Sequence, residues 1–169
     1  MSGQNSSSSC TNTNLHFVDF EEHAAGFASY SAVTAIVYLP YATSLMSAFE
    51  MYALNIPIFT PSLEYKIELE RVHAVELSWG WYVPPWRTVP ADIPSPVNAS
   101  ERARRHWLNK SDFVTLPHLQ HFDNDLELCR QLCNADLDAI SERMRVQNDM
   151  DLRAHTQFWA SFLRTRYWL

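Results

Sequence analysis

Four residues between positions 43 and 50 have the types and spacing of a site for a phosphorylated ligand. Thr43, Ser47 and Glu50 follow an i, i+4, i+7 spacing, which places them on one face of a helix. Free backbone N–H groups near Thr43 and Ser44 would attract a phosphate, and the Ser47 hydroxyl would add a donor one turn later. The Glu50 carboxylate would accept hydrogen bonds from a ribose diol. These four residues are our candidate binding site for a nucleotide diphosphate.

The same residues also fit a purely structural interpretation. Ser47-Ala48-Phe49-Glu50 matches the S-x-x-E capping box, in which Ser47 caps a helix and Glu50 bonds back to the backbone of the cap. Capping at Ser47 would leave a helix of barely two turns. Capping at Thr43 or Ser44 gives a longer helix and leaves Ser47 and Glu50 free. The sequence leaves both hypotheses open.

Two apolar runs flank this helix. We expect strands at Ala35–Leu39, ended by a Pro40-Tyr41 turn, and at Ile56–Phe59, closed by Thr60-Pro61-Ser62. Near-continuous apolar strands are typical of a parallel sheet that is covered on both faces. A right-handed strand–helix–strand unit places the helix start at the carboxyl edge of the sheet, where ligands bind in open α/β folds.

The helix itself is expected over Ser44–Leu54. Its apolar face at helical spacing consists of Leu45, Phe49, Tyr52 and Ala53. This assignment leaves Ser47 and Glu50 on a different, polar face.

The stretch from Val33 to Glu64 resembles the donor-binding half of GT-B glycosyltransferases. The resemblance rests on the S-x-x-E helix, on Ile56-Pro57-Ile58-Phe59 and on Pro61. In that family a helix is followed by a Gly-x-Pro-aliphatic-aliphatic strand, and a helix glutamate binds the nucleotide ribose. Glu50 stands seven residues before Pro57, as that glutamate does, and Ser47 falls where a hydroxyl contacts the diphosphate. The resemblance implies a nucleotide-sugar substrate, with no cofactor and no implied metal.

Three positions depart from the family pattern. Asn55-Ile56 replaces the usual glycine, and Ala42 stands where retaining enzymes have the first glutamate of a pair. Tyr65-Lys66 occupies the place of the Asp-Gln that holds the sugar. A GT-B enzyme needs two Rossmann-like domains, and 169 residues suffice for one. We therefore expect binding without turnover unless an N-terminal GT-B domain or a partner chain is present, and we assign no catalytic residue.

The rest of the chain predicts an α/β, three-layer Rossmann-like domain with a short, mostly parallel sheet and a long C-terminal helical segment. Residues 1–14 are expected to be a disordered tail, residues 15–169 the domain and residues 78–96 a Trp/Pro-rich loop. Further strands are expected at Leu15–Phe20 and Leu116–Phe122. Helices are expected at Glu21–Tyr30, Leu63–Leu77, Glu101–Trp107, from Asp123 or Asn124 to about Gln147 with a break near 134–136, and in the C-terminal segment 150–169.

Composition excludes several classes of function. The net charge of −6 argues against a nucleic-acid partner, and only three glycines leave no dinucleotide-binding or P-loop motif. No apolar run is long enough to span a membrane, and the start of the chain lacks the pattern of a signal peptide. This favours the cytoplasm, although the compartment stays undetermined.

The cysteine and histidine pattern predicts no metal site. Cys129 and Cys133 lie one helical turn apart and are expected to pack in the core. His118 and His121 would point to opposite faces of a strand, which argues against zinc binding with these cysteines.

Two other functions compete with nucleotide-sugar binding. The first is a non-catalytic protein-interaction domain that retains the fold, favoured by the missing half, by Ala42 and by the Trp/Pro segment. The second is a flavodoxin-like or methyltransferase-like nucleotide domain, although its usual glycine-rich loop is absent.

Overall fold

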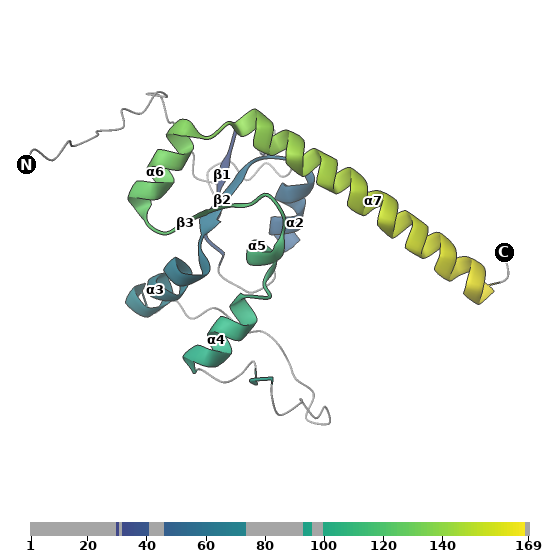
Figure 1. The fold of residues 1–169 in the computed structure, drawn as a ribbon, viewed down its shortest axis with the longest axis horizontal. Coiled ribbons are helices and arrows are strands. Elements are labelled where there is room, and N and C mark those ends of the chain that lie inside the picture. The colour runs from purple at the N-terminus through teal and green to yellow at the C-terminus, as the bar shows by residue number, and fades with distance from the viewer. Residues whose placement is uncertain (1–29, 31, 41–45, 74–92, 96–99, 168–169) are drawn as a thin grey trace, which may run out of the picture.

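The computed structural model describes residues 30, 32–40, 46–73, 93–95 and 100–167 (Figure 1). The predicted strand at Leu15–Phe20, the helix at Glu21–Tyr30 apart from Tyr30, and most of the Trp/Pro segment lie outside these residues. Thr43 and Ser44 of the candidate site also lie outside them.

The described chain is an α/β structure built on a parallel sheet, as predicted. Its strands are β1 (Ile36–Val37), β2 (Ile58–Pro61) and β3 (Gln120–Phe122), in the order β1-β2-β3. Ile36 pairs with Ile58, and Thr60 pairs with His121. The helices are α2 (Met46–Ala53), α3 (Leu63–His73), α4 (Glu101–Leu108), α5 (Asp112–Thr115), α6 (Asp125–Asn134) and α7 (Leu137–Tyr167).

The central strand begins two residues later than predicted. Asn55 has a φ of 59°, and this left-handed turn after α2 leaves Ile56 and Pro57 as a lead-in to β2. At its other end the strand continues through Pro61, because β3 pairs with it as far as Phe122. All four residues of β2 are buried, as expected for a strand covered on both faces.

The predicted third strand is shorter than expected. Its first four residues, 116–119, lie outside the sheet, and His118 among them has a φ of 64°. The side-chain amide of Gln120 donates a 2.7 Å hydrogen bond to the His118 carbonyl and stabilises this turn. Only the last three residues of the predicted run therefore reach β2.

The buried face of α2 differs from the predicted one. Ala48, Met51 and Tyr52 are buried, whereas Phe49 is 41% exposed and Ala53 is exposed. The prediction for Phe49 and Ala53 was therefore wrong. The face is chosen by what packs against it, namely Ile58 of β2 and the first turns of α7.

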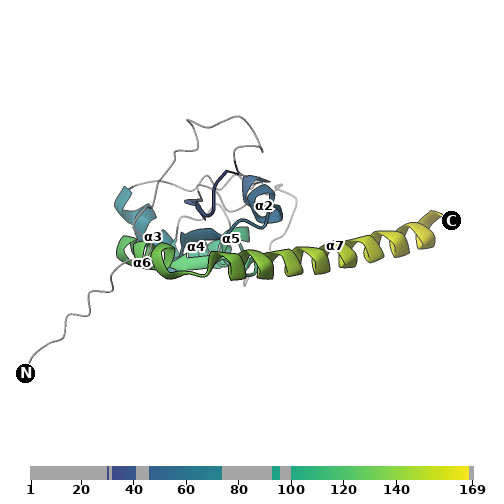
Figure 2. The ribbon, with the colours of Figure 1, turned by 90° about the horizontal axis from the view of Figure 1, so that it is seen from above.

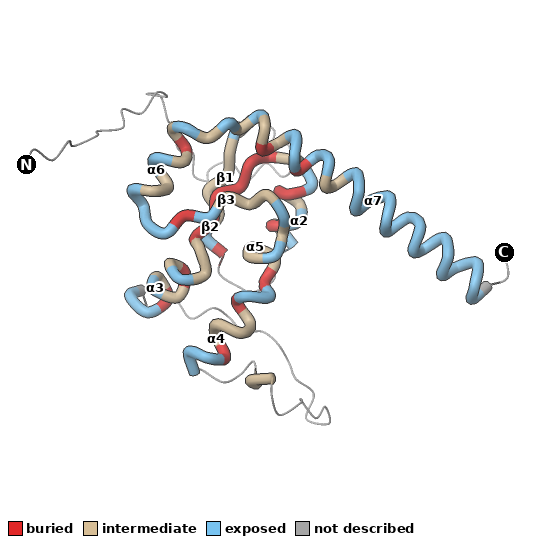
Figure 3. Tube along the Cα trace, in the orientation of Figure 1, coloured by how far each residue is buried: buried red, intermediate tan, exposed pale blue. Residues whose placement is uncertain are grey.

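Helices cover both faces of the sheet. On one face Ile58 packs with Met51 and Tyr52 of α2 and with Ile140 and Met144 of α7. On the other face, Phe59 and Phe122 pack against Leu132 of α6. A third cluster, around Leu108 and Phe113, joins α3, α4 and α5. Figure 3 shows the buried positions concentrated in β2 and in the segments around it.

The two C-terminal helices meet at the predicted break. The Asn124 side chain accepts a 2.9 Å hydrogen bond from the Glu127 N–H at the start of α6, and Asp136 caps α7 by accepting one from Ala139. Beyond that break the prediction of a separate final helix was wrong, because α7 runs unbroken for 31 residues. Figure 2 shows α7 extending well past the rest of the molecule.

Candidate functional site

Two of the four predicted site residues fall on described parts of the chain. Ser47 is the second and Glu50 the fifth of the eight residues of α2, and both are partly exposed. Because α2 includes Met46, Ser47 stands inside the helix rather than at its cap. Within the described residues, no hydrogen bond joins Ser47 to Glu50, so their side chains are not engaged in a capping box. Burial raises the pKa of the Tyr30 phenol, and the nearby Glu50 carboxylate raises it further.

The position of α2 between two parallel strands sets where these residues lie. β1 and β2 are neighbours in the sheet, and α2 connects them. Such a connection starts at the carboxyl end of the first strand, so Ser47 lies nearer that edge than the later turns of α2. The carboxyl edge is also where β2 passes directly into α3.

A buried lysine lies at this edge. Lys66, in the first turns of α3, is only 5% exposed. Its ammonium donates a hydrogen bond to the backbone carbonyl of Pro40, beyond the end of β1, and lies 5.0 Å from the ring centroid of Phe113. Burial lowers the pKa of Lys66 to about 8, and the nearby Glu70 carboxylate acts in the opposite direction. A lysine ammonium carries three donors, so the bond to Pro40 leaves two.

Glu70 and Arg104 complete a charged cluster with Lys66. Glu70 stands one helical turn after Lys66 and is 8% exposed. Burial raises the pKa of the Glu70 carboxyl, while Lys66 and Arg104 oppose that rise. Neither Oε1 of Glu70 nor Nε of Arg104 has a hydrogen-bond partner in the part of the chain that the structure describes. With all three groups ionised, this cluster of two cations and one anion carries one net positive charge.

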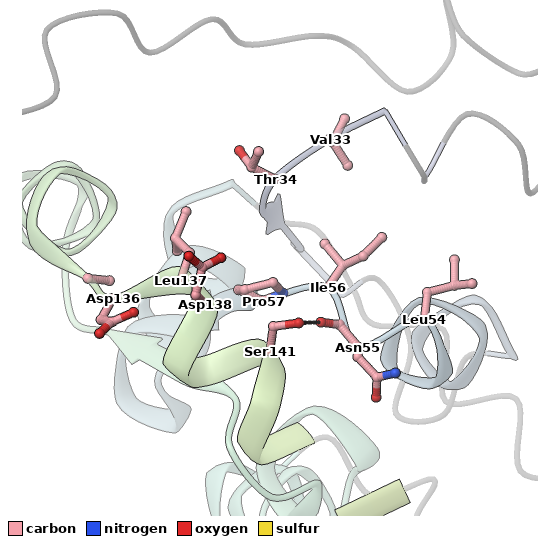
Figure 4. Close-up of a pocket in the computed structure, with 11 residues that line it drawn as sticks. Val33, Thr34, Leu54, Asn55, Ile56, Pro57, Asp136, Leu137, Asp138 and Ser141 are labelled. Atoms are coloured by element: carbon pink, nitrogen blue, oxygen red, sulfur yellow. Dashed lines mark hydrogen bonds between the residues drawn. The ribbon is translucent and has the colours of Figure 1, made fainter. Parts of the chain in front are cut away.

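The opposite, amino edge of the sheet carries an open groove of about 530 Å³ (Figure 4). It lies between the turn that leads into β2 and the start of α7, where the Ser141 hydroxyl donates a 2.7 Å hydrogen bond to the Asn55 carbonyl. Asp136 and Asp138 line it. Two carboxylates in one groove repel a phosphate. The charges therefore favour the carboxyl edge, and not this groove, for an anionic ligand.

The metal-like set of His118, His121, Cys129 and Cys133 forms no centre. Among the described residues, no group of three or more His, Cys, Asp or Glu side chains is placed to hold a metal ion. Cys129 is an exposed free thiol, so its predicted place in the core was wrong. Burial lowers the pKa of His121, and its ring donates to the Pro61 carbonyl, which opposes that shift.

Sequence reasoning missed the three members of the charged cluster. A Lys66–Glu70 pair at i, i+4 beside the apolar Leu63 and Ile67 was the available signal, because it placed both charges next to the buried face of the helix. In the helix predicted at Glu101–Trp107, the neighbouring Arg105 instead forms ion pairs with Glu64 and Glu101.

Comparison with known protein families, curated proteins and solved structures finds no match to this chain. Within the described ranges, no helix combines the length and the apolar character that crossing a bilayer requires.

Proposed function

We propose that this chain binds a nucleotide-sugar at the carboxyl edge of its sheet, as the donor-binding half of a glycosyltransferase of GT-B type. The backbone N–H groups near Thr43 and Ser44, which precede α2, bind the diphosphate, with the Ser47 hydroxyl as a further donor. Glu50 accepts hydrogen bonds from the ribose. In this proposal the layers of the described chain belong to a Rossmann-like domain.

The observation that carries the proposal is the β1–α2–β2 unit with two uncommitted polar side chains on its helix. β1 and β2 are parallel neighbours, and Ser47 and Glu50 form no hydrogen bond with any other described residue. A polar group that is not used within the fold is available to a ligand. The GT-B resemblance assigns ligand contacts to these same two positions.

The charged cluster of Lys66, Glu70 and Arg104 supports an anionic ligand at this edge. Its net positive charge lies beside Pro40, the last described residue before the segment that holds Thr43 and Ser44. Since Lys66 is buried, its contribution is an electrostatic field rather than a direct contact, and a low-dielectric setting strengthens such a field. Transfer of the sugar requires groups from a second domain, so the chain alone binds without turnover.

The alternative function is a non-catalytic protein-interaction domain, and the far half of α7 favours it. Every residue from 149 to 166 on this helix is exposed, including Leu152, Phe158 and Trp159. A run of large apolar side chains on a projecting helix is typical of a contact surface. The two functions are compatible, because α2 and the far half of α7 are separate parts of the molecule.

Calorimetric titration of UDP and GDP into the purified chain tests the proposal. We expect saturable binding of at least one nucleotide. Glu50→Gln should weaken it about tenfold or more, because a hydrogen bond to a charged group contributes roughly 1.5–3 kcal/mol. Ser47→Ala should weaken it less. Glu68→Gln is the matched control, since it removes an exposed carboxylate on α3 and should leave the affinity unchanged.

The decisive comparison is between folded variants. Circular dichroism should show the same helix content for Glu50→Gln and for Glu68→Gln. Absence of binding up to millimolar nucleotide would overturn the proposal and leave the interaction domain as the better account. Equal affinities of the wild type and Glu50→Gln would remove Glu50 from the site.

A further inference from the structure

The far half of α7 continues a buried face of the same helix into solvent. In its first turns Ile140 and Met144 pack in the core, and Asn148 donates to the Tyr52 carbonyl at 3.1 Å. From residue 149 to residue 166 every side chain is exposed. Figure 3 shows this change from mixed burial to full exposure along one unbroken helix.

Helical spacing places the exposed aromatic side chains on that same face, with Leu152 and Leu163 about 80° and 100° from Met144 along its border. At 100° per residue, Phe158 and Phe162 fall within about 40° of Met144 around the helix, and Trp159 lies about 60° from it. We call five residues the α7 stripe; their exposed fractions are 67% for Leu152, 61% for Phe158, 56% for Trp159, 37% for Phe162 and 41% for Leu163. The stripe is therefore an exposed apolar surface that no described residue covers.

The aromatic members of the stripe form one ordered group. The ring centroids of Phe158 and Trp159 lie 5.5 Å apart, and those of Trp159 and Phe162 lie 5.6 Å apart. The Arg166 guanidinium lies 5.7 Å from the Phe162 centroid, which holds its positive charge at the end of the stripe. Aromatic groups of this kind are the usual anchors of protein interfaces.

Charge at the two ends of the stripe has opposite signs. Asp151 and Arg166 both fall within about 40° of Met144 around the helix. Asp151 lies seven residues before Phe158, and Arg166 lies seven residues after Trp159. A two-fold axis between Phe158 and Trp159 therefore places Asp151 of one copy opposite Arg166 of another in an antiparallel pair. A parallel pair would instead set like charges side by side.

We propose that the α7 stripe docks onto the α7 stripe of a second copy of this chain, antiparallel, with the two-fold axis between Phe158 and Trp159. Phe158 of each copy packs against Trp159 of the other, and two Asp151–Arg166 ion pairs close the ends. The paired segment, residues 151–166, lies beyond the turns of α7 that pack in the core. The two sheets with their covering helices therefore lie at opposite ends of the dimer. This proposal does not depend on nucleotide binding.

The size of the surface predicts a weak, reversible dimer. Five partly exposed side chains in each copy bury on the order of 100 Å² each, or about 1,000 Å² in total. Interfaces of this size are at the low end for specific complexes. Association is therefore expected at tens to hundreds of micromolar protein.

Sedimentation velocity over that concentration range tests the pairing. The full chain should shift from monomer to dimer, and Trp159→Glu should abolish the shift. Gln157→Glu is the matched control, because it adds the same charge about 160° away around the helix from Trp159 and should dimerise like the wild type. Equal helix content of the two variants by circular dichroism excludes unfolding as the cause.

A charge exchange tests the antiparallel register. Asp151→Arg alone and Arg166→Asp alone should each weaken the dimer several-fold, and the double variant should restore it. A chain that stays monomeric up to several hundred micromolar would overturn the proposal. A dimer that Trp159→Glu leaves intact, or whose single charge variants are not rescued by the double exchange, would overturn it equally.

Discussion

The ammonium of Lys66 in α3 donates a hydrogen bond to the carbonyl of Pro40, 26 residues earlier and just beyond β1. This bond joins the helix after β2 to the loop after β1, and both are at the carboxyl edge of the sheet. A cation buried at that point contributes positive charge to the edge where parallel sheets bind ligands. It also ties the free energy of unfolding to the protonation of one lysine.

Stability should rise with pH in a window set by Lys66. The pKa of this lysine is lowered from 10.5 to about 8 in the folded chain. Between these values the unfolded chain binds more protons, so the free energy of unfolding increases as pH rises. The gain between about pH 7.5 and 9.5 should be about 2 kcal/mol. Urea denaturation at several pH values measures it.

The variant Lys66→Met should remove most of this rise, whereas Lys110→Met, at an exposed position, should keep it. The comparison of stabilities ends near pH 9.5, because burial also raises the pKa values of Tyr30 and Tyr52. Their ionisation in the unfolded chain lowers stability at higher pH. A flat profile in the wild type, or the same rise in Lys66→Met, would contradict this assignment.

Two methionines on α7 should respond very differently to truncation. Met144 is fully buried in the core cluster, whereas Met150 is 60% exposed. We expect Met144→Ala to lower the free energy of unfolding by about 2–5 kcal/mol and Met150→Ala to change it by about 0.5 kcal/mol or less. Thermal and urea unfolding of the two variants provide the measurement. Similar losses in both would mean that α7 packs differently from the arrangement described.

The left-handed turn at Asn55 gives a third stability prediction. The φ of 59° disfavours any residue with a Cβ that lacks the local bonding of asparagine. The Asn55 side chain also accepts a 2.6 Å hydrogen bond from Asn148. Asn55→Gly loses that bond only, whereas Asn55→Ala also incurs the left-handed penalty of about 1–2 kcal/mol. In chemical denaturation, the free energy of unfolding should decrease from the wild type to Asn55→Gly and again to Asn55→Ala. Equal free energies of unfolding for the two variants would contradict the backbone argument.

The sequence predicted the parallel sheet because its signal is local. The apolar runs at β1 and β2 and the caps at Asn124 and Asp136 are written in neighbouring residues. The buried face of α2 was misassigned, because Phe49 and Met51 are both apolar and only the packing of α7 selects between them.

The charged cluster was predictable only in part, because the i, i+4 spacing of Lys66 and Glu70 is local whereas their contacts are not. Lys66 is buried through a contact with Pro40, and Glu70 through its position near Arg104, far along the chain. The continuity of α7 was likewise missed. The prediction ended this helix near Gln147, whereas the next residue, Asn148, donates hydrogen bonds to Asn55 and Tyr52 from inside an unbroken helix.

The most direct test of the central proposal is a two-dimensional ¹H–¹⁵N NMR titration of the labelled chain with UDP and GDP. It reports which edge of the sheet the nucleotide contacts. We expect the amide signals of Ser47, Glu50 and Lys66 to shift in a saturable manner, while those of Asp136 and Ser141 in the amino-edge groove stay in place. Shifts confined to Asp136 and Ser141, or no shifts at millimolar nucleotide, would contradict a nucleotide-sugar site at the carboxyl edge.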